Sequence, residues 1–175
     1  NELNVFPVAD GDTGTNMSKT LENGLRHAVE TPHAGYFLRG LSEGMLYGAR
    51  GNSGVILSQF FRGMYEETAR KDMLGPGEMR NALIAGYKSA YKAVSRPVEG
   101  TILTVSRLGI ENIRSQISRS TTIDALLSMY VAEMKRVLSS TPEILPVLKE
   151  SGVVDSGAVG FICILEGMEK YLYGE

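Results

Sequence analysis

A chain of 175 residues has the length of one domain, and its net charge of −2 gives no reason to expect nucleic acid or an acidic membrane surface as a partner. No apolar run approaches the roughly 20 residues that span a bilayer. The first residues lack the basic region followed by an apolar core that is typical of a signal peptide. The one cysteine, Cys163, excludes an internal disulfide bond and predicts a cytoplasmic protein, while its apolar neighbours predict a buried thiol.

Apolar residues recur at helical spacing along almost the whole chain, beginning with Leu21, Leu25 and Ala28 on one face of a first helix. The predicted helices, about seven or eight in number, cover residues 17–29, a segment around 37–46, and residues 53–70, 79–94, 100–117, 122–138, 141–149 and 156–173. A weak strand candidate around Pro7 is isolated and contains proline. The sequence therefore predicts an all-α fold, a helical bundle or closed helical barrel, in one domain over residues 1–175.

Asp10 and Asp12 are two positions apart in a polar loop before the first helix, flanked by Gly11 and Gly14. Carboxylate oxygens on a tightly folded loop suit a hard cation such as Mg²⁺. Aspartates before a helix are also typical of simple helix capping, so residue types alone leave both interpretations open. An EF-hand is excluded, because that loop would need glycine and glutamate where this chain has other residues.

In each of three later loops, glycine and polar residues directly precede an apolar helix. Such a helix start offers backbone N–H groups to an anion such as phosphate, and Arg50 adds a positive charge in the first of these loops. Ordinary helix capping requires the same residue types, so here too both interpretations stay open. The three loops cover residues 48–54, 96–101 and 152–158.

Common nucleotide-binding motifs, among them the P-loop and the dinucleotide-binding glycine motif, are missing from the sequence. The two histidines, His27 and His33, lie outside the four loops. Their positions predict surface residues rather than catalysts.

Taken together and in order, the four loops resemble the DAK2 (DhaL-type) domain of the dihydroxyacetone kinase family. The resemblance spans essentially the whole chain. Within this family, the four motifs are most similar to those of the N-terminal ATP-binding domain of bacterial fatty acid kinase. The resemblance rests on Asn-Val-Phe-Pro-Val-Ala-Asp-Gly-Asp-Thr-Gly-Thr-Asn-Met from Asn4, Ala-Arg-Gly-Asn-Ser-Gly around Ser53, Pro-Val-Glu-Gly-Thr around Thr101, and Gly-Val-Val-Asp-Ser-Gly around Asp155.

The resemblance implies an antiparallel eight-helix barrel that binds ATP or ADP through two Mg²⁺ ions, with catalytic, metal-binding carboxylates at Asp10 and Asp12. The dihydroxyacetone kinase branch has a third aspartate just upstream of this pair, and Asn4 stands nearest to that place as a further candidate metal ligand. The implied nucleotide-binding residues are Thr13, Gly14, Thr15, Asn16, Met17, Gly51, Asn52, Ser53, Thr101, Asp155 and Gly157.

The resemblance also implies transfer of the γ-phosphoryl group of ATP to a fatty acid carboxylate, which a separate fatty-acid-carrying protein presents. Further domains of the same polypeptide are expected, since the chain begins at Asn1 within a motif. A carboxylate acceptor is ionised at neutral pH and needs no general base, in keeping with histidines that lie outside the loops. Two alternatives remain: the ADP-binding subunit of dihydroxyacetone kinase, and a non-catalytic helical interaction module. The sequence leaves homodimer formation open.

Overall fold

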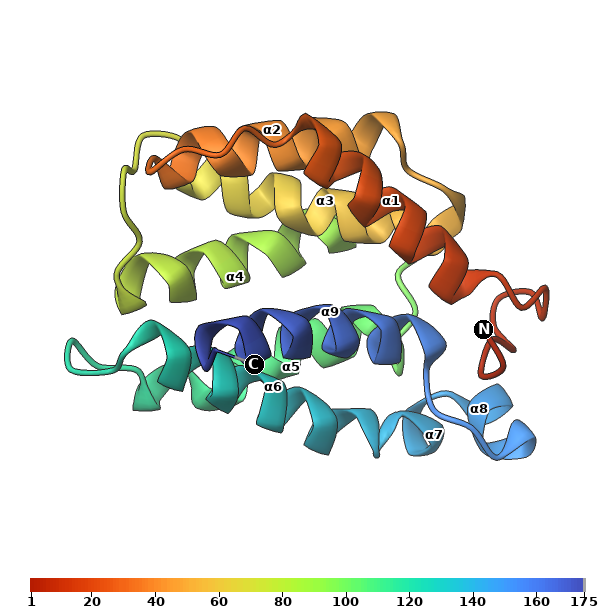
Figure 1. Cartoon of the computed structure of the whole chain (residues 1–175). Coiled ribbons are helices and arrows are strands. Elements are labelled where there is room, and N and C mark those ends of the chain that lie inside the picture. The colour runs from red at the N-terminus through yellow and green to blue at the C-terminus, as the bar shows by residue number, and fades with distance from the viewer. Residues whose placement is uncertain (175) are drawn as a thin grey trace. The chain divides into compact units, whose positions relative to one another are not determined.

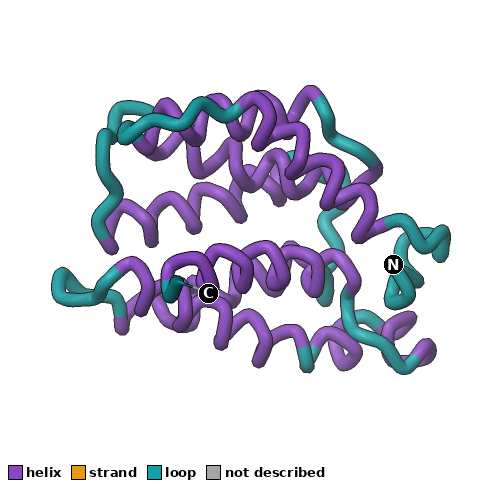
Figure 2. Tube along the Cα trace, viewed as in Figure 1, coloured by secondary structure: helices purple, strands orange, loops and turns teal. Residues whose placement is uncertain are grey.

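The computed structural model describes residues 1–174, and over these residues it contains α-helices, one short 3-10 helix and no strand (Figures 1 and 2). The elements in chain order are α1 (Thr13–His27), α2 (Ala34–Tyr47), α3 (Gly51–Thr68), α4 (Pro76–Lys92), α5 (Ile102–Ile113), η1 (Arg114–Gln116), α6 (Ile123–Leu138), α7 (Thr141–Ile144), α8 (Pro146–Ser151) and α9 (Ser156–Leu172). The predicted all-α class is confirmed. None of the helices formed by residues 1–174 combines the length and the hydropathy that a membrane span requires.

One predicted helical segment, residues 141–149, is divided into α7 and α8. The division falls at Leu145, whose backbone is extended with φ −116° and ψ 103°. Pro146 follows it, and proline disfavours the helical conformation of the preceding residue while fitting the first position of a new helix. The proline therefore ends α7 and starts α8.

Contacts between Cα atoms group the chain into two compact units. Unit 1 consists of Asn1–Gly14 and the chain from Val98 onward, and unit 2 of Thr15–Pro97. Helix α1 begins in unit 1 and continues in unit 2, because its first two residues belong to the former. A single domain and closure of the helices into one barrel both stay predictions.

In unit 2, helix α3 packs against both α2 and α4. Helix α1 lies against α2 through Gly24, where an added Cβ would lie 2.3 Å from Cγ of Met45 and 2.9 Å from the carbonyl oxygen of Leu41. The buried face of α1 is formed by Met17, Thr20 and Gly24, whereas Leu25 is 54% exposed. Of the predicted apolar stripe, Leu21 and Ala28 are only half-buried and Leu25 is exposed, because close approach of the two helices requires small residues rather than leucines.

In unit 1, helix α5 packs against α6 and α9, and its first five residues are all buried. The buried face of α9 is formed by Ala158, Phe161, Ile162 and Leu165 at helical spacing. Cys163 lies outside that face and is exposed. The predicted buried thiol is therefore wrong: Cys163 has apolar neighbours in sequence, but the helix turns its own side chain away from the core.

Candidate functional site

The loop before α1 is closed by the side chain of Asn4, which is only 6% exposed. Its Nδ2 donates to the carbonyl oxygen of Val8 at 2.9 Å. Its Oδ1 accepts from the backbone N–H groups of Asp12 and Thr13, at 3.2 and 3.3 Å. Asn4 thus joins both sides of the loop and caps the first turn of α1, where N–H groups lack helical partners.

Asp10 and Asp12 belong to this closed loop, and both are exposed. Between them Gly11 has φ +67°, a left-handed conformation that favours glycine. Within residues 1–174, neither carboxylate takes part in a hydrogen bond or ion pair. Other acids of unit 1, such as Glu99 and Glu133, are paired with arginines. The aspartate pair is therefore held in place by its backbone while its oxygens stay available to a cation.

No group of three or more His, Cys, Asp or Glu side chains in the described part of the chain could hold a metal ion, so a cation at this loop would take further ligands from elsewhere. A site of this kind suits Mg²⁺, which commonly keeps water molecules and takes further oxygens from substrate phosphates. The structure gives the amide of Asn4 backbone partners, and its role as a metal ligand stays a prediction.

A second part of unit 1 is built around Asp155, which is 6% exposed. Its Oδ2 accepts the N–H groups of Ile102 and Ala158, both at 2.8 Å. Ile102 is the first residue of α5, and Ala158 lies in the first turn of α9. One carboxylate oxygen therefore caps two helices. Burial raises the pKa of Asp155 to about 6, although these N–H groups act in the opposite direction.

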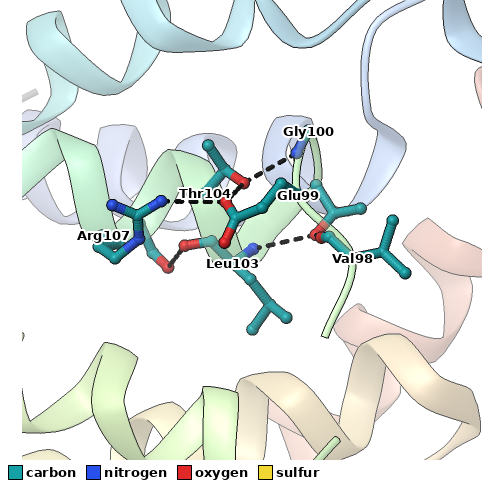
Figure 3. A network of polar contacts seen from close by, with 8 residues as sticks. Val98, Glu99, Gly100, Leu103, Thr104 and Arg107 are labelled. Carbon is teal, nitrogen blue, oxygen red and sulfur yellow. Dashed lines mark hydrogen bonds and ion pairs between the residues drawn. The ribbon is translucent and has the colours of Figure 1, made fainter. Parts of the chain in front are cut away.

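Thr101 caps α5 from its own side: its Oγ1 donates to the carbonyl oxygen of Val98 at 2.8 Å and accepts from the N–H of Leu103 at 3.4 Å. A polar network fixes the same loop one turn further on (Figure 3). Oγ1 of Thr104 accepts from the N–H of Gly100 at 2.8 Å and donates to Glu99. Arg107 binds the same Glu99 carboxylate at 3.0 Å (Figure 3). The loop before α5 is thus fastened to the helix that it precedes.

The starts of α1 and α9 are also linked, because Oγ of Ser156 donates to Oγ1 of Thr13 at 3.3 Å. Together with the cap at Asp155, this contact connects the amino termini of α1, α5 and α9 within unit 1. Each helix amino terminus carries partial positive charge. Side chains of the protein itself already accept the N–H groups of Thr13, Ile102 and Ala158. The partial positive charge gathered at these three helix starts favours an anion, such as the phosphates of a nucleotide.

In unit 2, the second predicted phosphate loop lies at the start of α3, beside the first turns of α1. An added Cβ at Gly51, which has φ +59°, would lie 2.5 Å from Nδ2 of Asn16. Thr20 fastens this region, since its Oγ1 donates to the carbonyl oxygen of Asn16 at 2.7 Å and accepts from the N–H of Arg50 at 3.2 Å. Met17 is buried and cannot offer much surface to a ligand.

The structure thus brings the predicted residues together as two groups, one in each unit. The group of unit 1 comprises Asn4, Asp10, Asp12, Thr13, Gly14, Thr101, Asp155 and Gly157, and the group of unit 2 comprises Thr15, Asn16, Met17, Gly51, Asn52 and Ser53. Sequence reasoning missed Thr20, Thr104 and the bond made by Ser156. A threonine on an otherwise apolar helix face was the available signal for the first two. Both histidines are exposed, as predicted.

An all-helical chain whose helix amino termini meet beside an unpaired carboxylate pair has the features of a phosphate-binding module. Residues 7–170 match the family model of the DAK2 domain, so the chain belongs to the DAK2 domain family. That family is part of the dihydroxyacetone kinase family, and its domains are kinase-related modules that bind ADP or ATP. The predicted family resemblance is confirmed.

The chain is similar to protein YloV of Bacillus subtilis, with 49% identity over 175 residues that cover 99% of this chain and 32% of that protein. It is 44% identical to protein MG369 of Mycoplasma genitalium over 187 residues, which cover all of this chain and 33% of that protein. Protein SH1689 of Staphylococcus haemolyticus is 43% identical over 176 residues, 99% of this chain and 32% of that protein. The chain therefore spans about a third of the length of these relatives. Their names state no reaction, and the closer resemblance to fatty acid kinase stays a prediction.

Proposed function

We propose that this chain is the magnesium- and nucleotide-binding domain of a kinase that transfers the γ-phosphoryl group of ATP to the carboxylate of a fatty acid. A separate fatty-acid-binding protein presents that acceptor. The observation that carries the proposal is the pair of exposed, unpaired carboxylates, Asp10 and Asp12, on a loop that Asn4 closes at the start of α1. Family membership supports the nucleotide, and the residues themselves support the metal.

Asp10 and Asp12 fit Mg²⁺ because they offer hard oxygen ligands that no cationic side chain among residues 1–174 neutralises. Bound there, one or two Mg²⁺ ions would offset the negative charge of the phosphate oxygens. Asn4 keeps the two aspartates in position, and the partial positive charge at the linked starts of α1 and α9 favours the same anionic ligand class. Phosphoryl transfer depends mainly on positioning and charge neutralisation, which these residues supply.

The acceptor is inferred from the bases that the chain offers. In the proposed reaction, a carboxylate oxygen attacks the γ-phosphorus, the bond to the β,γ-bridging oxygen breaks, and ADP leaves with the electron pair. No proton has to be removed from the acceptor, whereas a hydroxyl acceptor such as dihydroxyacetone would need a base. His27 is exposed at the end of α1 and His33 is bound to Asp72 at 2.8 Å. Asp155 is buried with its Oδ2 engaged by two N–H groups, so it is not available as that base.

Delivery by another protein agrees with the lining of two hollows on the described part of the chain. A hollow of about 270 Å³ on α9 is lined by Glu166, Glu169, Lys170 and Tyr173. Another, of about 250 Å³ in unit 2, is lined mainly by charged and polar residues. Neither suits an acyl chain, which requires apolar walls. We therefore assign acyl binding to a carrier protein and propose that further domains of the polypeptide, in the cytoplasm, complete the enzyme.

Calorimetric titration of ADP into this chain, with and without Mg²⁺, tests the metal site. We expect binding that depends on Mg²⁺ and is lost in Asp12→Ala. Glu150→Gln is the matched control, because Glu150 is an exposed acid of unit 1 without a hydrogen bond or ion pair among residues 1–174. Unchanged Mg²⁺-dependent binding in Asp12→Ala would show that the carboxylates act only as part of a turn.

The acceptor is tested with the full-length protein, ATP and a fatty acid on its carrier. Hydroxylamine converts an acyl phosphate to a hydroxamate, which mass spectrometry detects. We expect the hydroxamate with the carrier-bound fatty acid and no phosphorylation of dihydroxyacetone. Phosphorylation of dihydroxyacetone without any hydroxamate would favour the dihydroxyacetone kinase alternative, and neither product together with absent ADP binding would favour a non-catalytic module.

A further inference from the structure

Asp155 stands apart from the other aspartates of the site because its carboxylate is buried and already engaged. Asp10 and Asp12 are exposed and lack partners in the described chain, whereas Oδ2 of Asp155 accepts two N–H groups at 2.8 Å. The backbone N–H of Asp155 in turn donates to Oγ1 of Thr141 at 3.3 Å, which fixes the residue from a third side. A side chain held in this way contributes through the elements that it joins.

Those elements are the starts of α5 and α9, and the contact that links them joins Ile102 to Asp155, 53 residues apart in sequence. Thr101 directly precedes α5, and Ser156, which contacts Thr13, is the first residue of α9. A single oxygen atom at Asp155 therefore sets the spacing between two helix amino termini of unit 1. Space beside it is limited, since an added Cβ at Gly157 would lie 3.3 Å from that oxygen.

We propose that Asp155 is a positioning residue, which joins the amino termini of α5 and α9 and thereby fixes the Thr101 loop for the nucleotide without touching the nucleotide itself. The inference rests on the proposed nucleotide-binding function. We call the link that Oδ2 of Asp155 makes between the N–H groups of Ile102 and Ala158 the joint. The joint requires an acceptor oxygen at this place, and it does not require a negative charge. Direct contact with Mg²⁺ would require the charge, so the two roles predict different behaviour of the same pair of variants.

Asp155→Asn keeps an acceptor oxygen of nearly the same shape, whereas Asp155→Ala removes it. We expect the dissociation constant of ADP, measured with Mg²⁺, to stay within about threefold of the wild type in Asp155→Asn and to rise at least about tenfold in Asp155→Ala. Thr122→Ala is the matched control, because Thr122 caps α6 of the same unit through its contact with the N–H of Ala125. Its affinity for ADP should equal that of the wild type.

Hydrogen exchange of the Ile102 and Ala158 amides measures the joint independently of any ligand. Both amides should exchange slowly in the wild type and in Asp155→Asn, and much faster in Asp155→Ala, while the core amides of α6 stay protected. Equal loss of affinity in Asp155→Asn and Asp155→Ala would overturn the inference, because it would show that the charge contacts the ligand or its metal. Protected amides in a wild type that binds no ADP would instead overturn the proposed function and leave the joint intact.

Discussion

Replacing Asp155 by asparagine removes a buried charge while leaving an acceptor for the two helix starts, and this should change how stability depends on pH. Burial raises the pKa of Asp155 to about 6 from its ordinary 3.8. A raised carboxyl pKa means that the folded state binds the proton more tightly than the unfolded chain does. The stabilisation from protonating this group is therefore fully present below about pH 4 and is lost as the pH rises through about 6.

The size of the effect follows from the two pKa values. Their difference, with each pKa unit worth about 1.4 kcal/mol, corresponds to about 3 kcal/mol over the whole acid range. Between pH 8 and pH 5 only part of this range is crossed, and the expected gain in the free energy of unfolding of the wild type is about 1.4 kcal/mol. No charged side chain among residues 1–174 is paired with Asp155, and the first turns of α5 and α9 carry no acid. Apart from Asp155 itself, Glu99 and Glu150 are the acids that precede the starts of α5 and α9 most closely in sequence; both are exposed, and Glu99 is paired with Arg107.

Urea unfolding followed by circular dichroism at pH 5, 6.5 and 8 measures this effect. The quantity to compare is the free energy of unfolding of Asp155→Asn minus that of the wild type. Other titrating groups, including Asp124 and Glu133 with their lowered pKa values, are common to both proteins and cancel. The difference should fall by about 1.4 kcal/mol from pH 8 to pH 5. A difference that is the same at all three pH values would refute the reasoning, because the carboxyl group would then not titrate in this range.

Three further predictions concern other positions. Asn4→Ala removes all three hydrogen bonds that close the loop and should lower the free energy of unfolding, measured in urea, by about 1–3 kcal/mol. The variant should also lose Mg²⁺-dependent affinity for ADP, and full affinity would contradict the closing role of Asn4. Gly24→Ala places a Cβ against Met45 and should lower the free energy of unfolding by about 1–3 kcal/mol in the same assay. The control is Gly77→Ala, whose added Cβ meets no atom within 4 Å and should not lower the free energy of unfolding. Equal stability of the two variants would speak against close packing at Gly24. Cys163 is exposed and should react with a thiol reagent in the native protein as fast as in urea, and a protected thiol would contradict its placement on α9.

The helices were predictable because their signal is local. Apolar residues at a spacing of about 3.6 residues mark each helix wherever one face is buried, and no other chain segment is needed to see the pattern. The spacing of apolar residues was misleading where a helix packs through small or polar residues. Helix α1 uses Thr20 and Gly24 as its packing face and leaves Leu25 exposed, which periodicity of apolar residues cannot reveal.

For the candidate site, the sequence predicts which residues belong to each loop, but it does not predict the contacts that those residues make. Two aspartates before a helix are compatible with a cap or a metal site, and the choice depends on whether another group satisfies the helix start. That group is Asn4, which lies eight residues before Asp12 in sequence. The joint at Asp155 depends on a partner 53 residues away, so its double capping role exists only in the folded chain.

The closing role of Asn4 also bears on why an amide stands at this position. Its Nδ2 donates to the carbonyl oxygen of Val8, and its Oδ1 accepts from two N–H groups. An aspartate would retain the second function and lose the first, since an ionised carboxylate has no proton to donate. It would also add a third negative charge beside Asp10 and Asp12. The amide therefore closes the loop from both sides while leaving the local negative charge at the two carboxylates of Asp10 and Asp12.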